Sequence, residues 1–108
     1  MKILTYNIHR CNQEKIDSIL QRGADIMALP ECACPDKVNL PDGYEMTWVG
    51  QYDFKGLGVI WKSAVKCEVA LWADDEHKYM IPLIVDGKWL LLTTWATMIT
   101  GDFNCYID

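Results

Sequence analysis

The sequence predicts a strand-rich α/β fold, close to the α+β type, in one domain over residues 1–108. Three features support this class. The chain begins with strand, helix and strand patterns within about thirty residues. It continues with short apolar runs separated by turn residues, and Asp86-Gly87 joins two of these runs as a hairpin. A parallel pair of strands should therefore be followed by an antiparallel meander.

The two parallel strands are expected near the N-terminus. Residues 3–8 alternate in polarity and include β-branched and aromatic types, so they predict the first strand. The second is expected over residues 25–29 and should stop at Pro30. A helix between them forms a crossover, which places both strands parallel in one sheet.

The connecting helix is predicted over about residues 13–22. Asn12 is a suitable N-cap, and Gly23 stands where the C-terminus of a helix favours glycine. One helix face is apolar, because three residues recur at helical spacing: Ile16, Ile19 and Leu20.

The middle of the chain, after a loop over residues 35–43, is predicted to be β-structure. The expected strands cover residues 45–49, 59–61, 65–72, 80–85 and 89–94. Residues 89–100 contain no Gly, Pro, Asn or Asp and exceed a typical strand of about five or six residues. We expect two strand-like halves in this run, without the usual connector between them.

Net charge limits the classes of function. The net charge is −5, the sequence pI is about 4.8, and the lysines are scattered rather than clustered. Tight, general DNA binding is disfavoured, because it depends on a basic surface that neutralises phosphates. A phosphate substrate bound together with a metal ion remains compatible with this charge.

The sequence predicts neither export nor membrane insertion. The N-terminus has no extended apolar segment of the signal-peptide type, and no run approaches the length of a membrane span. The five cysteines form no standard zinc motif. Free thiols in a reducing cytoplasm are therefore expected.

Four polar residues follow predicted strands: Asn7, Glu31, Asp102 and Asn104. Because Asn7 and Glu31 end two parallel strands, their side chains should meet at one edge of the sheet, where α/β proteins commonly place sites. Asp102 and Asn104 follow another apolar run. Carboxylate and amide oxygens are hard ligands that suit Mg²⁺ or Mn²⁺.

Three of these four residues also have a simpler interpretation. Asn7 could be a turn-forming residue, and Glu31 could be a solvated loop acid. Asp102 could accept backbone N–H groups in a turn after Gly101. Their common position at strand ends favours a shared site.

Three ordered motifs resemble those of the endonuclease/exonuclease/phosphatase family. They are MKILTYN, ADIMALPE and TGDFN, and the intervening KGLGVIWK and DGKWLLLTTW are also similar to the family's core strands. The resemblance extends over essentially the whole chain. It implies a sandwich of mixed sheets flanked by helices. It also implies metal-dependent hydrolysis of phosphate esters or phosphodiesters, nucleic acid among them.

The resemblance implies roles for the residues at the motif positions. Glu31 would be the principal ligand of Mg²⁺ or Mn²⁺, and Asn7 would support the metal or a phosphate oxygen. Asp102 would orient or deprotonate the attacking water, and Asn104 would hydrogen-bond a phosphate oxygen. His9 is a candidate phosphate contact, although a structural or solvent-facing histidine is the simpler interpretation.

The chain also departs from the family pattern. The family usually has a histidine near the position of Trp95, a helical connector before GDFN and an Asp-His pair after it. His9 and His77 match neither histidine position. We therefore expect a shortened or incompletely represented form of a larger domain. The alternative function is a catalytically inactive remnant that binds a partner or assembles.

The tryptophan content bears on assembly. Five tryptophans are many for a chain of this length. They are expected to pack in the core and at its rim, and stacking on nucleic-acid bases is the alternative role. Missing family elements would leave apolar strands uncovered, and such surfaces favour self-association. We therefore predict a homo-oligomer.

Overall fold

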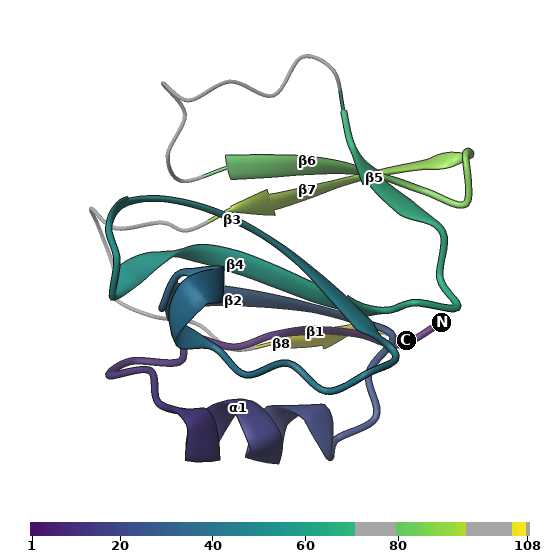
Figure 1. Cartoon of the computed structure of the whole chain (residues 1–108). Helices are drawn as coiled ribbons and strands as arrows, with labels where there is room; N and C mark the ends of the chain where they lie inside the picture. The colour runs from purple at the N-terminus through teal and green to yellow at the C-terminus, as the bar shows by residue number, and fades with distance from the viewer. Residues whose placement is uncertain (71–79, 95–104, 108) are drawn as a thin grey trace.

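The computed structural model describes residues 1–70, 80–94 and 105–107, the last of these as backbone. These residues form a small α+β domain, in which a five-stranded mixed sheet lies between the helix α1 and a three-stranded antiparallel sheet (Figure 1). The elements are β1 (Ile3–Thr5), α1 (Gln13–Leu20), β2 (Ile26–Cys32), the short 3-10 helix η1 (Pro35–Lys37), β3 (Tyr44–Tyr52), β4 (Lys55–Lys62), β5 (Cys67–Val69), β6 (Met80–Val85), β7 (Trp89–Thr94) and β8 (Cys105–Ile107).

The helix α1 begins and ends at the residues that the sequence indicates. The Asn12 side chain accepts a hydrogen bond from the backbone N–H of Lys15 at 2.9 Å, which confirms the predicted N-cap. Gly23 has a φ of 73° and donates its N–H to the Leu20 carbonyl. The buried residues Ile16, Ile19 and Leu20 pack against the large sheet. Each contributes about 1.5–3 kcal/mol of transfer free energy.

The predicted parallel crossover is confirmed. β1 pairs with β2 in parallel register, with Ile3 opposite Ile26. Pairing continues past the end of β1, because the Tyr6 N–H donates to Ala28 and the Ile8 N–H donates to Pro30, both at 3.0 Å. The strand β1 covers only Ile3–Thr5, but its hydrogen bonding to the neighbouring segment extends to Ile8, as expected for a strand over residues 3–8.

The prediction that Pro30 stops the second strand is wrong, because β2 continues to Cys32. A register shift between Leu29 and Cys32 interrupts the pairing with β4 at this point. Such a bulge tolerates a proline, which has no N–H to donate. The Pro30 carbonyl meanwhile accepts from Ile8 on the other side. The bulge leaves Glu31 at the end of the parallel pair.

The large sheet has the order β3-β4-β2-β1-β8. β3 and β4 form an antiparallel hairpin, and β4 pairs antiparallel with β2. The Trp48 ring lies over Gly50 and Gly56, where any Cβ would collide with it, and its Nε1 donates to the Cys32 carbonyl at 2.9 Å. The glycines of this hairpin thus make room for the tryptophan.

The small sheet has the order β5-β6-β7. The predicted Asp86-Gly87 hairpin is confirmed, with φ angles of 55° and 67° that are typical of a type I′ turn. A strand was expected over residues 65–72, but the observed strand β5 covers only Cys67–Val69. Residues 71 and 72 lie outside the described part of the chain. The part of residues 89–100 that the structure describes is the single strand β7, which ends at Thr94.

The two sheets pack face to face around a buried cluster. The large sheet contributes Ile26, Leu57, Val59 and Trp61, and the small sheet contributes Ile81, Leu83 and Val85. The expectation of flanking helices is met at one face only within the described residues, where α1 covers the large sheet (Figure 1). No helix in this part of the chain is long and apolar enough to cross a membrane.

Candidate functional site

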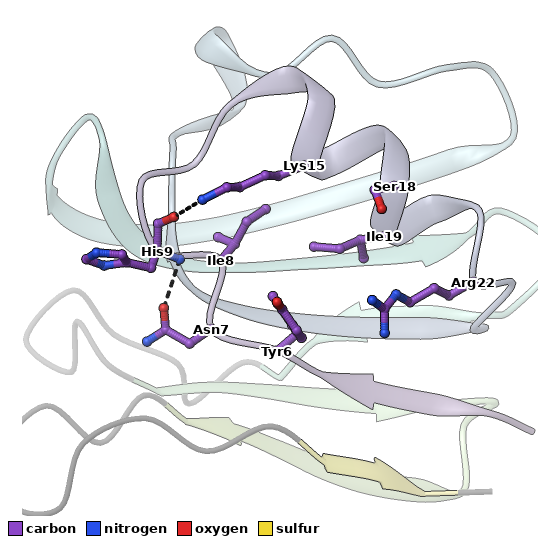
Figure 2. A pocket seen from close by; sticks show the side chains of 8 residues that line it. All are labelled: Tyr6, Asn7, Ile8, His9, Lys15, Ser18, Ile19 and Arg22. Carbon is purple, nitrogen blue, oxygen red and sulfur yellow. Dashed lines mark hydrogen bonds between the residues drawn. The ribbon is translucent and has the colours of Figure 1, made fainter.

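Asn7 lies just beyond β1, on the segment that still pairs with β2. Its side chain is only 7 % exposed. Its Oδ1 accepts the backbone N–H of His9 at 2.9 Å, as Figure 2 shows. This i to i+2 contact is an Asx turn, so Asn7 has the turn-forming geometry that was one of its two interpretations. It fixes the backbone that carries His9.

Glu31 lies at the same edge of the sheet, directly after the residue that pairs with Ile8. Its φ is 60°, in the left-handed region that residues other than glycine rarely adopt. Its side chain is 15 % exposed. Backbone strain of this kind is often found at functional sites. The parallel pairing therefore brings Asn7 and Glu31 to one edge, as expected, with Glu31 in an unusual conformation.

The His9 imidazole and the Lys55 ammonium flank the Glu31 carboxylate. His9 Nδ1 lies 3.4 Å from one carboxylate oxygen, and Lys55 Nζ lies 3.7 Å from the other. The His9 and Lys55 side chains are 66 % and 58 % exposed, so solvent screens both interactions. Sequence reasoning did not identify Lys55. It reaches Glu31 because β4 pairs antiparallel with β2, with Gly56 opposite Cys32.

A pocket of about 160 Å³ lies on the α1 side of Asn7 and His9 (Figure 2). Lys15 Nζ donates to the His9 carbonyl, and the Arg22 guanidinium lies 5.6 Å from the centre of the Tyr6 ring. The lining residues come from the end of β1 and from α1: Tyr6, Asn7, Ile8, His9, Lys15, Ser18, Ile19 and Arg22. Positive charge therefore borders the candidate site on this side.

A pair of thiols lies next to the site along the chain. Cys11 is half-buried and packs against the cluster that contains Cys32. A hydrogen bond from the Cys32 thiol, helped by the Ala33 N–H and the Lys15 charge, lowers the pKa of Cys11 to about 6 against the opposing effect of burial. The same hydrogen bond and burial raise the pKa of Cys32. These cysteines are unbridged, as expected.

The other two predicted site residues, Asp102 and Asn104, lie outside the described residues. The next described residue along the chain, Cys105, begins β8 and pairs with Thr5 of β1. β8 therefore borders the strand that leads to Asn7.

The donor chemistry at this edge suits a hard cation. Glu31 supplies carboxylate oxygens and Asn7 an amide oxygen, and Mg²⁺ is commonly held by one or two carboxylates together with water. Within residues 1–70, 80–94 and 105–107, no three His, Cys, Asp or Glu side chains form a cluster that could hold a metal. A cation at Glu31 would have to displace the contacts of His9 and Lys55.

Known proteins provide no family assignment for this chain. No protein-family model matches it, and neither does any curated protein. The candidate site therefore rests on the ordered sequence motifs and on the geometry around Glu31.

Proposed function

We propose that the chain is a metal-dependent phosphohydrolase or phosphodiesterase of the endonuclease/exonuclease/phosphatase type, with part of that family's fold. One observation carries the proposal. The parallel pairing of β1 with β2 brings Asn7 and Glu31 to one edge of the sheet. The Ile8 N–H donates a hydrogen bond to the Pro30 carbonyl, which links the two segments that carry these residues. The ordered motifs around both residues support the same assignment.

In this proposal Glu31 holds Mg²⁺ or Mn²⁺, with Asn7 as a supporting residue. The bound cation would polarise a phosphoryl oxygen and stabilise developing charge. Asn7 fixes the turn that presents His9. The His9 imidazole and the positive charge of Lys55 would face the phosphate. By their motif positions, Asp102 would orient the attacking water and Asn104 would donate to a phosphate oxygen.

We further propose a cytoplasmic location and a homo-oligomeric state. The unbridged cysteines Cys11, Cys32, Cys34 and Cys67 support the first. The second is supported by the small sheet, where Leu90 and Leu92 of the terminal strand β7 are each half or more exposed.

The test is hydrolysis of a generic phosphodiester, bis(p-nitrophenyl) phosphate, by this chain with and without Mg²⁺. Activity should require the cation and should fall by about 10²-fold or more in Glu31→Ala, since a group that stabilises charge in the transition state has that effect. Glu45→Gln is the matched control, because Glu45 is exposed in β3 and pairs opposite Trp61, away from Lys55.

Absence of Mg²⁺-dependent turnover in the unmodified chain would contradict the proposal for these residues. It would favour the alternative function, a non-catalytic module that binds a partner or assembles. Activity that is unchanged in Glu31→Ala would also contradict it, because the carboxylate is the central group of the site.

A further inference from the structure

Two cysteine side chains lie together on the α1 side of the large sheet. Cys32, the last residue of β2, is fully buried in the cluster that α1 covers. Cys11 lies between β1 and α1, is half-buried and packs against the same cluster. The Ile8 N–H donates to the Pro30 carbonyl at 3.0 Å, so the segments that lead to the two cysteines run side by side. The fold therefore brings together two thiols that are distant in the sequence.

The Cys11 sulfur has two contacts with the end of β2. The Cys32 thiol donates a hydrogen bond to it, and the Ala33 N–H donates a second. These contacts, together with the charge of Lys15, lower the pKa of Cys11 to about 6 against the effect of burial. Because the thiolate is the form that peroxides oxidise, a half-buried acidic thiol is a susceptible site. The Cys32 thiol lies at the position that a resolving cysteine requires, in contact with the sulfur that is oxidised.

Two other cysteines provide comparisons. Cys34 follows Cys32 by two residues and is only 8 % exposed, so the protein shields its sulfur from a peroxide in solution. Cys67 lies on β5 and packs against the cluster between the two sheets. Burial raises the pKa of Cys67 to about 11, so little of this thiol is ionised at neutral pH. Among these residues, Cys11 alone combines partial exposure with an acidic thiol.

We propose that Cys11 and Cys32 are a peroxide-sensitive pair, which a hydroperoxide converts to a disulfide and a thiol reductant restores. The Cys11 thiolate attacks one peroxide oxygen and the O–O bond breaks, so Cys11 becomes a sulfenic acid and the other oxygen leaves as an alcohol or water after taking up a proton. The Cys32 sulfur then attacks the Cys11 sulfur and the S–O bond breaks. The hydroxide leaves as water with the Cys32 proton. The two thiols lose two electrons in total, and the peroxide gains them.

The disulfide would link the loop after β1 to the end of β2. An S–S bond of about 2.05 Å requires the sulfurs to approach more closely than in a hydrogen bond. Cys11 lies outside any helix or strand, so the loop can supply this movement without a change in the sheet. The link would connect the segments that carry His9 and Glu31 and would constrain that edge. The inference goes beyond the proposed function and depends on neither metal binding nor hydrolysis.

The test is disulfide mapping of the full chain after brief exposure to hydrogen peroxide at pH 7. Iodoacetamide blocks the remaining thiols, and non-reducing peptide mass spectrometry of the monomer band identifies linked peptides. The unmodified chain should give a Cys11–Cys32 link that dithiothreitol removes, while Cys67 stays free. Cys34→Ser is the matched control and should keep the link, because Cys32 and Cys34 share one tryptic peptide. Cys11→Ser should abolish the link and leave Cys32 reduced, since Cys32 is buried.

The rate of oxidation gives a second readout. Peroxide should consume the Cys11 thiol about 10-fold or more faster than the Cys67 thiol at pH 7, because the larger thiolate fraction outweighs the lower nucleophilicity of an acidic thiol. Equal rates would overturn the proposal. So would a chain that stays reduced, a Cys11 sulfinic acid formed without a link, or a link from Cys11 to a cysteine other than Cys32.

Discussion

At the scale of single residues, one residue of the site and one beside it have unusual properties. Glu31 has a left-handed backbone and lies between His9 and Lys55. Cys11 has an acidic thiol, because Cys32 donates to it. Neither property follows from a residue's type. Each arises where the bulge in β2 brings together groups that are distant in the sequence.

The left-handed conformation of Glu31 predicts a difference between two variants that both lack the carboxylate. Glu31→Gly should be more stable than Glu31→Ala by about 1 kcal/mol, because a Cβ is unfavourable at a φ of 60° and glycine has none. Urea denaturation of both variants measures the difference. An alanine variant as stable as the glycine variant would show that the backbone is not held in this conformation.

The pKa of Cys11 predicts selective alkylation. The thiolate is the reactive form, so the rate for Cys11 should be half-maximal near pH 6, because its pKa is lowered to about 6. Burial, with Asp86 and Glu45, raises the pKa of Cys67 to about 11, so this thiol serves as an internal control that should react slowly at pH 7. Iodoacetamide labelling followed by peptide mass spectrometry gives both profiles. Coincident profiles would contradict the assignment.

At the scale of elements, local patterns predicted the helix and the turns, and non-local pairing decided the rest. Asn12 and Asp86-Gly87 lie where capping and turn chemistry require them. The continuation of β2 through Pro30 depends on the bulge opposite β4, and that pairing joins segments about thirty residues apart. Sequence spacing does not reveal such a pairing. For the same reason Lys55 was missed, while Asn7 and Glu31, which end neighbouring strands, were predicted to meet.

Asp25, the residue before β2, contacts the residue before β1 and the last residue of β4, which predicts a pH dependence of stability. Its carboxylate accepts the Lys2 N–H at 2.7 Å and lies 3.6 Å from Lys62 Nζ. The Lys2 hydrogen bond, with Lys62 and the N-terminus, lowers the pKa of Asp25 below its ordinary value of 3.8. Because the folded-state pKa is the lower one, the carboxylate's contribution is present above pH 3.8 and is lost as the pH falls through the folded-state pKa.

The corresponding variant is Asp25→Ala. It should lose about 1–2 kcal/mol at pH 7, and the deficit should shrink below pH 3.8. Asp25→Asn is the control, because its amide oxygen can still accept the Lys2 N–H but does not titrate in this range. Thermal unfolding from pH 2 to 7 measures both. A deficit for Asp25→Ala that is constant with pH would contradict this role.

At the scale of the whole molecule, the described residues form three layers with unequal coverage. α1 covers the large sheet, and the two sheets cover each other (Figure 1). Leu90 and Leu92 of β7 are 55 % and 50 % exposed. The sequence indicated that some apolar strand residues would stay uncovered only through the family elements that the chain lacks. It could not indicate which strand would carry the exposed residues, because that depends on how the sheets pack.

The exposed residues of β7 predict self-association of this chain. Light scattering at high concentration should give the mass of a dimer or larger assembly, and Leu90→Lys with Leu92→Lys should shift it toward the monomer, since charges on a terminal strand oppose edge pairing. Glu14→Lys, at an exposed position of α1 and away from the small sheet, is the control for added positive charge. A monomer at all concentrations would contradict the prediction.

The most direct test of the central claim is to locate the bound metal. Mn²⁺ added to the ¹⁵N-labelled chain broadens amide signals near its site, so NMR spectra report the position without requiring activity. The account predicts broadening of the amide signals of residues 7–9, 31 and 32, and its loss in Glu31→Ala. Broadening centred elsewhere, or the same broadening in Glu31→Ala, would show that Glu31 is not the metal ligand and would remove the basis of the proposed chemistry.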